Sequence, residues 1–247
     1  MKGEQRDDGG EGEEEKRGKL SIVATPIGNL GDMTFRGLWN LKEANVIYAE
    51  DTRVISKLMS HYGLRTSMQR LDAATESKKS KEVAERLRNL EHVAYVTDAG
   101  TPGISDPGAR LVAYIRQEVP EAIIETLPGP SALTAALSIA GLEGGEFTFL
   151  GFLPQKKGRQ TALKKIAALV RPDSPQAGHP VVLYESPHRI LKLLSELQSV
   201  GIKDVRIGRE LTKMYEEFLV GTPESLAADL KKRKANRGEF VVIVVGH

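Results

Sequence analysis

The chain has 247 residues with a formal net charge of +2, and 40% of them are hydrophobic and 28% charged, which is typical of a soluble globular protein rather than a histone-like polycation. The absence of cysteine excludes disulfides, thiolate zinc sites and cysteine nucleophiles, and because the five histidines lack metal-ligand spacing we expect no metal site. Since neither a signal peptide nor an apolar run of roughly 18 residues occurs, we expect a cytoplasmic protein without a membrane span.

The first 17 residues differ from the rest of the chain in composition. They contain almost no apolar side chain and are rich in acidic residues. Such a segment cannot bury enough apolar surface to fold, so we predict a disordered tail over 1–17. The remaining chain is mildly basic, which suits an anionic partner.

Apolar runs and helical patterns alternate through the first half. Because strands that alternate with helices form mostly parallel sheets, this half is predicted to be an α/β domain. Asp106 and Pro107 have the residue types of an N-cap and a first helical position, and 66–79 is expected to be a loop with one short strand. Strands are expected at 20–24, 45–49, 93–96 and 123–126, and helices at 33–41, 54–61, 82–90, from 107 onward and at 132–139.

Three loops rich in proline and glycine follow strands of this half, at 25–32, within the stretch 96–110 and at 127–131. The central loop is too long for an ordinary connection between a strand and a helix, which usually takes two to six residues. The strand at 45–49 ends in the charged run 50–53. Since ligands bind at the carboxyl edge of parallel sheets, these segments are predicted to frame one pocket.

The second half, from about residue 144, has a different order of elements and is predicted to be a second α/β domain. We therefore divide the chain into the tail and two domains, at 18–143 and 144–247. Strands are expected at 147–152, 181–184, 205–209, 218–221 and 239–245, and helices at 162–170, after 185–189 to about 200 and at 223–231.

The loops lack two common phosphate-binding motifs. Neither G-x-G-x-x-G after the first strand nor G-x-x-x-x-G-K-[ST] is present, which argues against dinucleotide and nucleoside triphosphate sites. Loops with prolines and aspartates instead suit a ligand without phosphates, such as an adenosine joined to a zwitterionic amino acid.

Several segments together carry a resemblance to a known family. They are VATPIGNLGDMT, AEDTR, KLMSHYG, VTDAGTPGISDPGARLV, PGPSALTAALS, FLGFLP, LYESPHRI, RELTKMYEEF and GEFVVIV. In this order they resemble the tetrapyrrole-methylase-type family of S-adenosylmethionine enzymes, and within it the small-subunit ribosomal RNA methyltransferase I group. One segment departs: 68–79 contains no histidine, where that group usually has one.

The resemblance implies two α/β domains with S-adenosylmethionine held in the cleft between them, and a homodimer. It also implies methylation of the ribose 2′-oxygen of a cytidine in the decoding region of 16S rRNA, within the small ribosomal subunit. The residues that match donor-binding loops of the family are Pro26, Ile27, Gly28, Asp98, Gly100, Thr101, Ile104, Ser131, Ala132, Tyr184 and Leu211.

A ribose hydroxyl is a poor nucleophile at neutral pH, so a positioned base is expected. The candidates are carboxylates at predicted strand ends: Asp51 first, then Glu185 and Glu210. Asp51 could instead pair with Arg53 or cap the helix that follows, and Glu185 could instead shape the donor pocket or bind Arg189. RNA phosphates are expected to contact basic side chains. These are Arg36, Arg53, Lys156, Lys157 and Arg159.

Two other functions stay open at this point. The same fold and donor could serve a tetrapyrrole or diphthamide precursor as methyl acceptor. Alternatively, the chain could be a non-catalytic ribosome-assembly factor that binds RNA, a reading that the unusual 68–79 segment keeps open.

Overall fold

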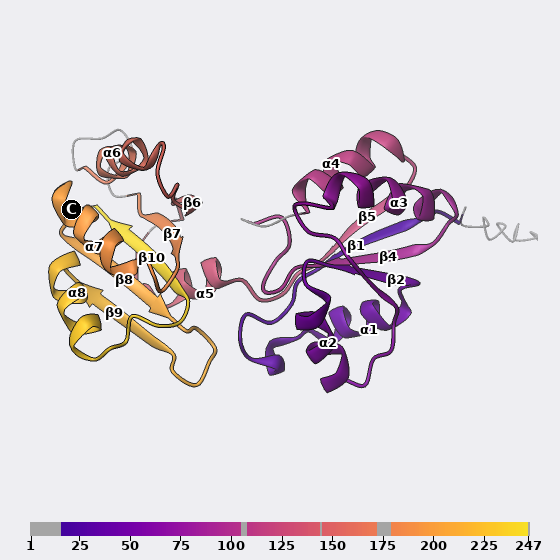
Figure 1. Ribbon diagram of the computed structural model, residues 1–247, viewed down its shortest axis with the longest axis horizontal. Coiled ribbons are helices and arrows are strands. Elements are labelled where there is room, and N and C mark those ends of the chain that lie inside the picture. Colours follow the sequence, from indigo (N-terminus) through magenta and orange to yellow (C-terminus); the bar gives the residue numbers. More distant parts are fainter. Residues whose placement is uncertain (1–15, 105–107, 144, 172–178, 247) are drawn as a thin grey trace, which may run out of the picture.

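The computed structural model describes residues 16–104, 108–143, 145–171 and 179–246. The two halves of the sequence each build one five-stranded sheet, and helices cover the faces of both (Figure 1). This arrangement confirms the predicted α/β class. The predicted disordered tail lies almost wholly outside the described residues.

The first sheet is parallel, as the alternating pattern predicts. Its strands are β1 (Lys19–Val23), β2 (Val46–Ala49), β3 (Met68–Arg70), β4 (His92–Val96) and β5 (Ile123–Leu127). Their order is β3-β2-β4-β1-β5, and every neighbouring pair is parallel. The carboxyl ends of β1, β2 and β4 therefore lie side by side at one edge.

Two pairs of helices cover this sheet. They are α1 (Phe35–Glu43) with α2 (Thr52–His61), and α3 (Glu76–Arg88) with α4 (Ala109–Glu118). Because successive strand residues point to opposite faces, β2 serves both layers. Ile47 and Ala49 pack in the core under α1 and α2, whereas Val46 and Tyr48 pack under α3 and α4.

The second sheet is mixed. Its strands are β6 (Thr148–Phe152), β7 (Val181–Glu185), β8 (Asp204–Arg209), β9 (Glu217–Gly221) and β10 (Phe240–Val245). The order is β6-β7-β10-β8-β9, in which β6 and β7 are parallel and the other neighbours antiparallel. One face packs against α6 (Arg159–Leu169), α7 (Ile190–Ser199) and α8 (Pro223–Lys232).

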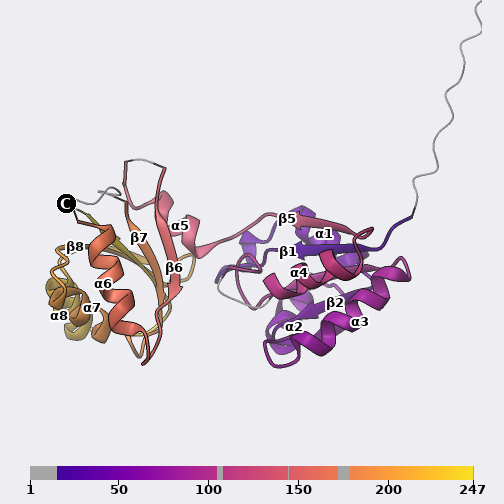
Figure 2. The same ribbon diagram turned by 90° about the horizontal axis from the view of Figure 1, so that it is seen from above.

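Helix α5 (Ala132–Ser138) covers the other face of the second sheet. Its Ala136 is buried with Val182 of β7 and Val241 of β10, and α5 lies beside that sheet in both views (Figures 1 and 2). Because the small residues of α5 pack closely on the second sheet, this helix belongs to the second half of the structure. The chain therefore passes from one sheet to the other within 128–131, between β5 and α5. The domain division between 143 and 144 stays a prediction, and this packing places the passage earlier.

Several helices begin at positions that differ from the predicted ones. Helix α1 begins two residues late, because Thr34 caps it through a hydrogen bond from the Gly37 amide, 3.0 Å long. Helix α3 begins six residues early, where Asp72 and Thr75 close a hydrogen-bonded turn before it. Helix α4 begins at Ala109, with Gly108 at the N-cap position; Asp106 and Pro107, the residues predicted for that helix start, lie outside the described residues.

Candidate active site

The first and central loops are joined by their backbones. The amides of Thr25 and Gly100 each donate to the other residue's carbonyl, at 3.0 Å. Gly100 has φ of +83°, a conformation that glycine adopts without strain. The Thr101 hydroxyl then donates to the carbonyl of Pro130, at 3.2 Å, which adds the third loop. Three loops that are far apart in sequence therefore form one wall, as predicted.

This wall borders a cavity of about 530 Å³ between the two sheets. Most of the residues predicted to bind the donor line it. They are Ile27, Asp98, Gly100, Thr101, Ile104, Ser131, Ala132, Tyr184 and Leu211. Of the other two, Pro26 is outside the lining, and Gly28 lies against the side chain of Lys213, where an added Cβ would come within 2.4 Å of the lysine Cγ.

A carboxylate that sequence reasoning did not select, Glu50, also lines the cavity. Burial raises its pKa, the charge of Asp98 raises it further, and a hydrogen bond from the Asp98 backbone offsets part of this. Burial likewise raises the pKa of Asp98. Two carboxylates with raised pKa values at a cavity wall are typical of a functional site.

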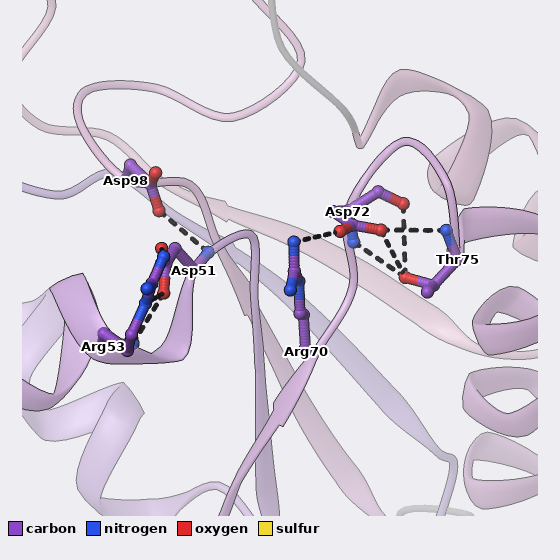
Figure 3. A network of polar contacts seen from close by, with 6 residues as sticks. All are labelled: Asp51, Arg53, Arg70, Asp72, Thr75 and Asp98. Atoms are coloured by element: carbon purple, nitrogen blue, oxygen red, sulfur yellow. Dashed lines mark hydrogen bonds and ion pairs between the residues drawn. The ribbon is translucent and has the colours of Figure 1, made fainter.

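Asp51, the first candidate base, is held differently. It caps α2, with Oδ1 accepting from the Arg53 amide at 2.9 Å and from the Arg53 Nε at 3.0 Å (Figure 3). These bonds lower the pKa of Asp51 to about 2. Asp51 is not part of the cavity lining, and so acidic a carboxyl is a weak proton acceptor. Aspartate is a preferred residue at helix N-caps. This preference is the signal in the sequence that assigns the cap to Asp51 and so points to its neighbour Glu50 as the carboxylate at the cavity.

Glu185 lines the cavity but belongs to a buried ionic cluster. Its carboxylate is fully buried, and Oε1 lies 2.7 Å from Nη2 of Arg189 and accepts from the Ser186 amide at 2.8 Å. Arg159 Nη2 lies 3.8 Å from Oε2. Because of these contacts, Glu185 is not accessible as a base, and it instead holds the arginine side chains around it in place.

Arg159, which is predicted to contact RNA, is buried in an ion pair, and this geometry argues against such a contact. Its side chain is only 5% exposed, and its Nε donates to both carboxylate oxygens of Glu196, at 2.8 and 3.0 Å. Reaching a phosphate would break a buried ion pair, which costs several kcal/mol. Lys156 and Lys157, just before it, are exposed.

Glu210, the third candidate base, lies outside the cavity lining in a second ionic cluster. Its Oε1 accepts from Lys213 Nζ and from the Glu239 amide, both at 2.9 Å. Burial alone would raise the pKa of Glu210, but these two donors outweigh it and leave the pKa lowered. Since Lys213 also contacts Gly28, this cluster joins the second half to the first loop.

The two remaining basic candidates lie in different places. The side chain of Arg53 is 85% exposed and stands beside Asp51 and Asp98 (Figure 3). Arg36 is exposed on α1, in a separate hollow with Phe35 and Trp39. Arg53 thus adjoins the cavity, whereas Arg36 does not line it.

The described part of the chain shows neither a metal site nor a membrane-spanning helix. No group of three or more His, Cys, Asp or Glu side chains there is arranged to hold a metal ion. None of its helices has the length and apolar content that a membrane crossing needs.

Comparison with known proteins agrees with this fold. Residues 19–227 match the family described as tetrapyrrole (corrin/porphyrin) methylases. The fold is shared with the methyltransferase CobJ (TM-score 0.66, 19% identity, 93% of this chain and 94% of that chain). It is also shared with diphthine synthase (TM-score 0.69, 16% identity, 92% of this chain and 90% of that chain).

The chain therefore belongs to the tetrapyrrole methylase family, and it is a methyltransferase with S-adenosylmethionine as methyl donor. Among curated proteins it is similar to ribosomal RNA small subunit methyltransferase I of Borrelia garinii subsp. bavariensis, with 43% identity over 91% of this chain and 97% of that protein. The protein of the same name from Thermotoga maritima is 39% identical over 93% of this chain and 99% of its own length.

Proposed function

We propose that this chain methylates the ribose 2′-oxygen of a cytidine in the decoding region of 16S rRNA, in the small ribosomal subunit. The observation that carries the proposal is the similarity along nearly the whole chain to proteins named ribosomal RNA small subunit methyltransferase I, at 39–43% identity. The likeness to CobJ and diphthine synthase, at 16–19% identity, supports the fold but not their acceptors.

The cavity fits the methyl donor chemically. Its walls combine apolar side chains such as Ile27 and Leu211 with small residues such as Ala132, and two carboxylates stand at the first sheet. Such a mixture suits an amphiphilic ligand that joins an adenosine to a charged amino acid. When bound, S-adenosylmethionine supplies a methyl group on a positively charged sulfur.

The chain's own task is to align the acceptor oxygen and to remove its proton. Alignment of two reactants in a cleft contributes much of the rate. Glu50 and Asp98 suit proton removal better than Asp51, because a carboxyl with a raised pKa holds a proton more strongly. We therefore assign the base to this pair, and leave Asp51 as a cap.

Two partner expectations belong to the same proposal. The enzyme acts as a homodimer in the cytoplasm, and exposed Arg53, Lys156 and Lys157 contact phosphates of the RNA. Sedimentation of the purified chain measures the first, since a dimer has twice the mass of the 27.0 kDa chain.

The test uses S-adenosylmethionine with a labelled methyl group and small ribosomal subunits that lack the modification. Digestion and mass spectrometry then locate the label. The expected product is a single 2′-O-methylated cytidine in the decoding region. Donor binding with no label on RNA contradicts the proposed acceptor and favours another one. Neither donor binding nor transfer favours the non-catalytic assembly factor.

A further inference from the structure

One aromatic side chain of the cavity is much more exposed than a core residue. Phe152, at the end of β6, is 51% exposed and lines the cavity. Its neighbour Leu153 is buried in the core of the second sheet. Burying an exposed aromatic ring is favourable, so a half-exposed ring on a cavity wall is available to a ligand.

The ring is supported from two sides. The guanidinium of Arg189 lies over it, 5.9 Å from the ring centroid. The ring of Tyr184 meets it at an interplanar angle of 60°, with 5.6 Å between centroids. Tyr184 is itself braced by Phe149, at 5.0 Å. A cation and an edge-on ring hold Phe152 in one orientation.

Arg189 is fixed in turn by the buried cluster beneath the cavity. Its Nη2 lies 2.7 Å from the carboxylate of Glu185, and its Nε donates to the hydroxyl of Ser186 at 3.1 Å. Glu185 thus acts through Arg189 as a positioning residue. This arrangement accounts for a fully buried glutamate at the floor of an open cavity.

The surroundings of Phe152 fit a nucleotide of the acceptor. Strand β6 is the outer strand of its sheet, and the exposed Lys156 and Lys157 follow Phe152 within five residues. The loops that resemble donor-binding segments in the first half of the chain contribute Gly100 and Ser131 to the same cavity. Proteins bind single-stranded RNA by combining aromatic rings for the bases with cations for the phosphates.

We propose that Phe152, backed by Arg189, is the surface on which the base of the target nucleotide stacks. This inference rests on the proposed function, because it names how the RNA is held at the same site. Stacking of the base would bring its ribose to the cavity, where Glu50 and Asp98 stand.

The test compares Phe152→Leu with a matched control, Phe147→Leu. Phe147 is 43% exposed and does not line the cavity, so both variants lose a similar exposed ring. We expect Phe152→Leu to raise the KM for RNA by about 10-fold, since stacking on an aromatic ring contributes about 1–3 kcal/mol per base. Phe147→Leu should leave KM unchanged, and Phe152→Trp should restore it.

A second readout separates the acceptor from the donor. A fluorescent cytidine analogue at the target position should be quenched by the wild type and not by Phe152→Leu, while the Kd for S-adenosylmethionine stays the same. A weaker donor Kd with an unchanged KM for RNA would overturn the proposal, because Phe152 would then contact the donor. If the wild type methylates RNA and Phe152→Leu does so equally well, stacking fails and the proposed function stands.

Discussion

The backbone amide of Asp51 donates to the carboxylate of Asp98 at 2.9 Å, and so joins the carboxyl ends of β2 and β4 (Figure 3). This bond keeps Asp98 at the cavity, while the carboxylate of Asp51 turns to Arg53. The two neighbours Glu50 and Asp51 therefore have opposite tasks: one faces the cavity and the other caps a helix.

This division of tasks predicts different effects of two isosteric substitutions. Glu50→Gln removes a proton acceptor and should lower kcat by about 10² to 10⁴, the usual contribution of a positioned base. Asp51→Asn keeps a good N-cap and should leave kcat nearly unchanged. Methyl transfer to small subunits under saturating donor measures both. If kcat fell more in Asp51→Asn than in Glu50→Gln, Asp51 would be the base.

The raised pKa of Glu50 predicts a pH dependence with a definite sign. A base must be unprotonated, so kcat/KM should fall on the acid side at a pH above the ordinary glutamate value of 4.5. Because the folded state binds this proton more tightly than the unfolded chain does, the contribution of Glu50 favours folding at low pH and is lost as the pH rises through the raised pKa.

The same linkage predicts how stability changes with Glu50→Gln. At neutral pH the substitution removes a charge that burial disfavours, so the melting temperature should rise although activity falls. Thermal denaturation at pH 5 and pH 8 measures this, and the gain should be larger at pH 8. An equal gain at both values would mean that titration of Glu50 is not involved.

The two backbone hydrogen bonds between Thr25 and Gly100 form part of the cavity wall, so a substitution that disturbs them should weaken binding of the donor. Gly100→Ala places a side chain at φ of +83°, which costs about 1–2 kcal/mol, and sets its Cβ 3.4 Å from Ile27. We expect a lower melting temperature and a higher Kd for S-adenosylmethionine by calorimetry. The control is Gly63→Ala. Gly63 has φ of +66°, and a Cβ added there would meet no atom within 4 Å, so this variant should also lose stability but should bind S-adenosylmethionine with an unchanged Kd.

The elements that the sequence predicts well are those that local chemistry determines. Alternating apolar runs give the parallel sheet, and proline and glycine mark the three loops that meet at the cavity. The tasks of single carboxylates depend on contacts between distant residues instead. Glu185 becomes a support because Arg189 and Arg159 reach it, and Glu50 has a raised pKa because it is partly buried beside Asp98 at the cavity. Spacing along the chain indicates only the pair of Glu185 with Arg189, four residues apart, whereas the contacts of Arg159 with Glu185 and of Asp98 with Glu50 join distant segments.

Arg159, Lys156 and Lys157 show how residues of the same type and nearly the same position in the sequence can differ in the structure. All three are basic and lie within four positions, yet Arg159 is buried on Glu196 and Lys156 and Lys157 are exposed. Arg159→Met should destabilise the fold by about 3–5 kcal/mol, because it removes the nearest cation from Glu196 and one of the two guanidinium groups beside the buried Glu185. Urea denaturation measures this loss.

The double variant Lys156→Gln, Lys157→Gln should change RNA binding and leave the stability of the fold unchanged. Its stability should match the wild type, since surface substitutions change it little. Its RNA affinity should depend less on salt, with the slope of log K against log[salt] reduced by about 1.4, the value for two phosphate contacts on a single strand. Arg159→Met should keep the wild-type slope at temperatures where it remains folded. If Arg159→Met reduced the slope and the lysine variant did not, the phosphate contact would belong to Arg159, and its buried ion pair would have to open when RNA binds.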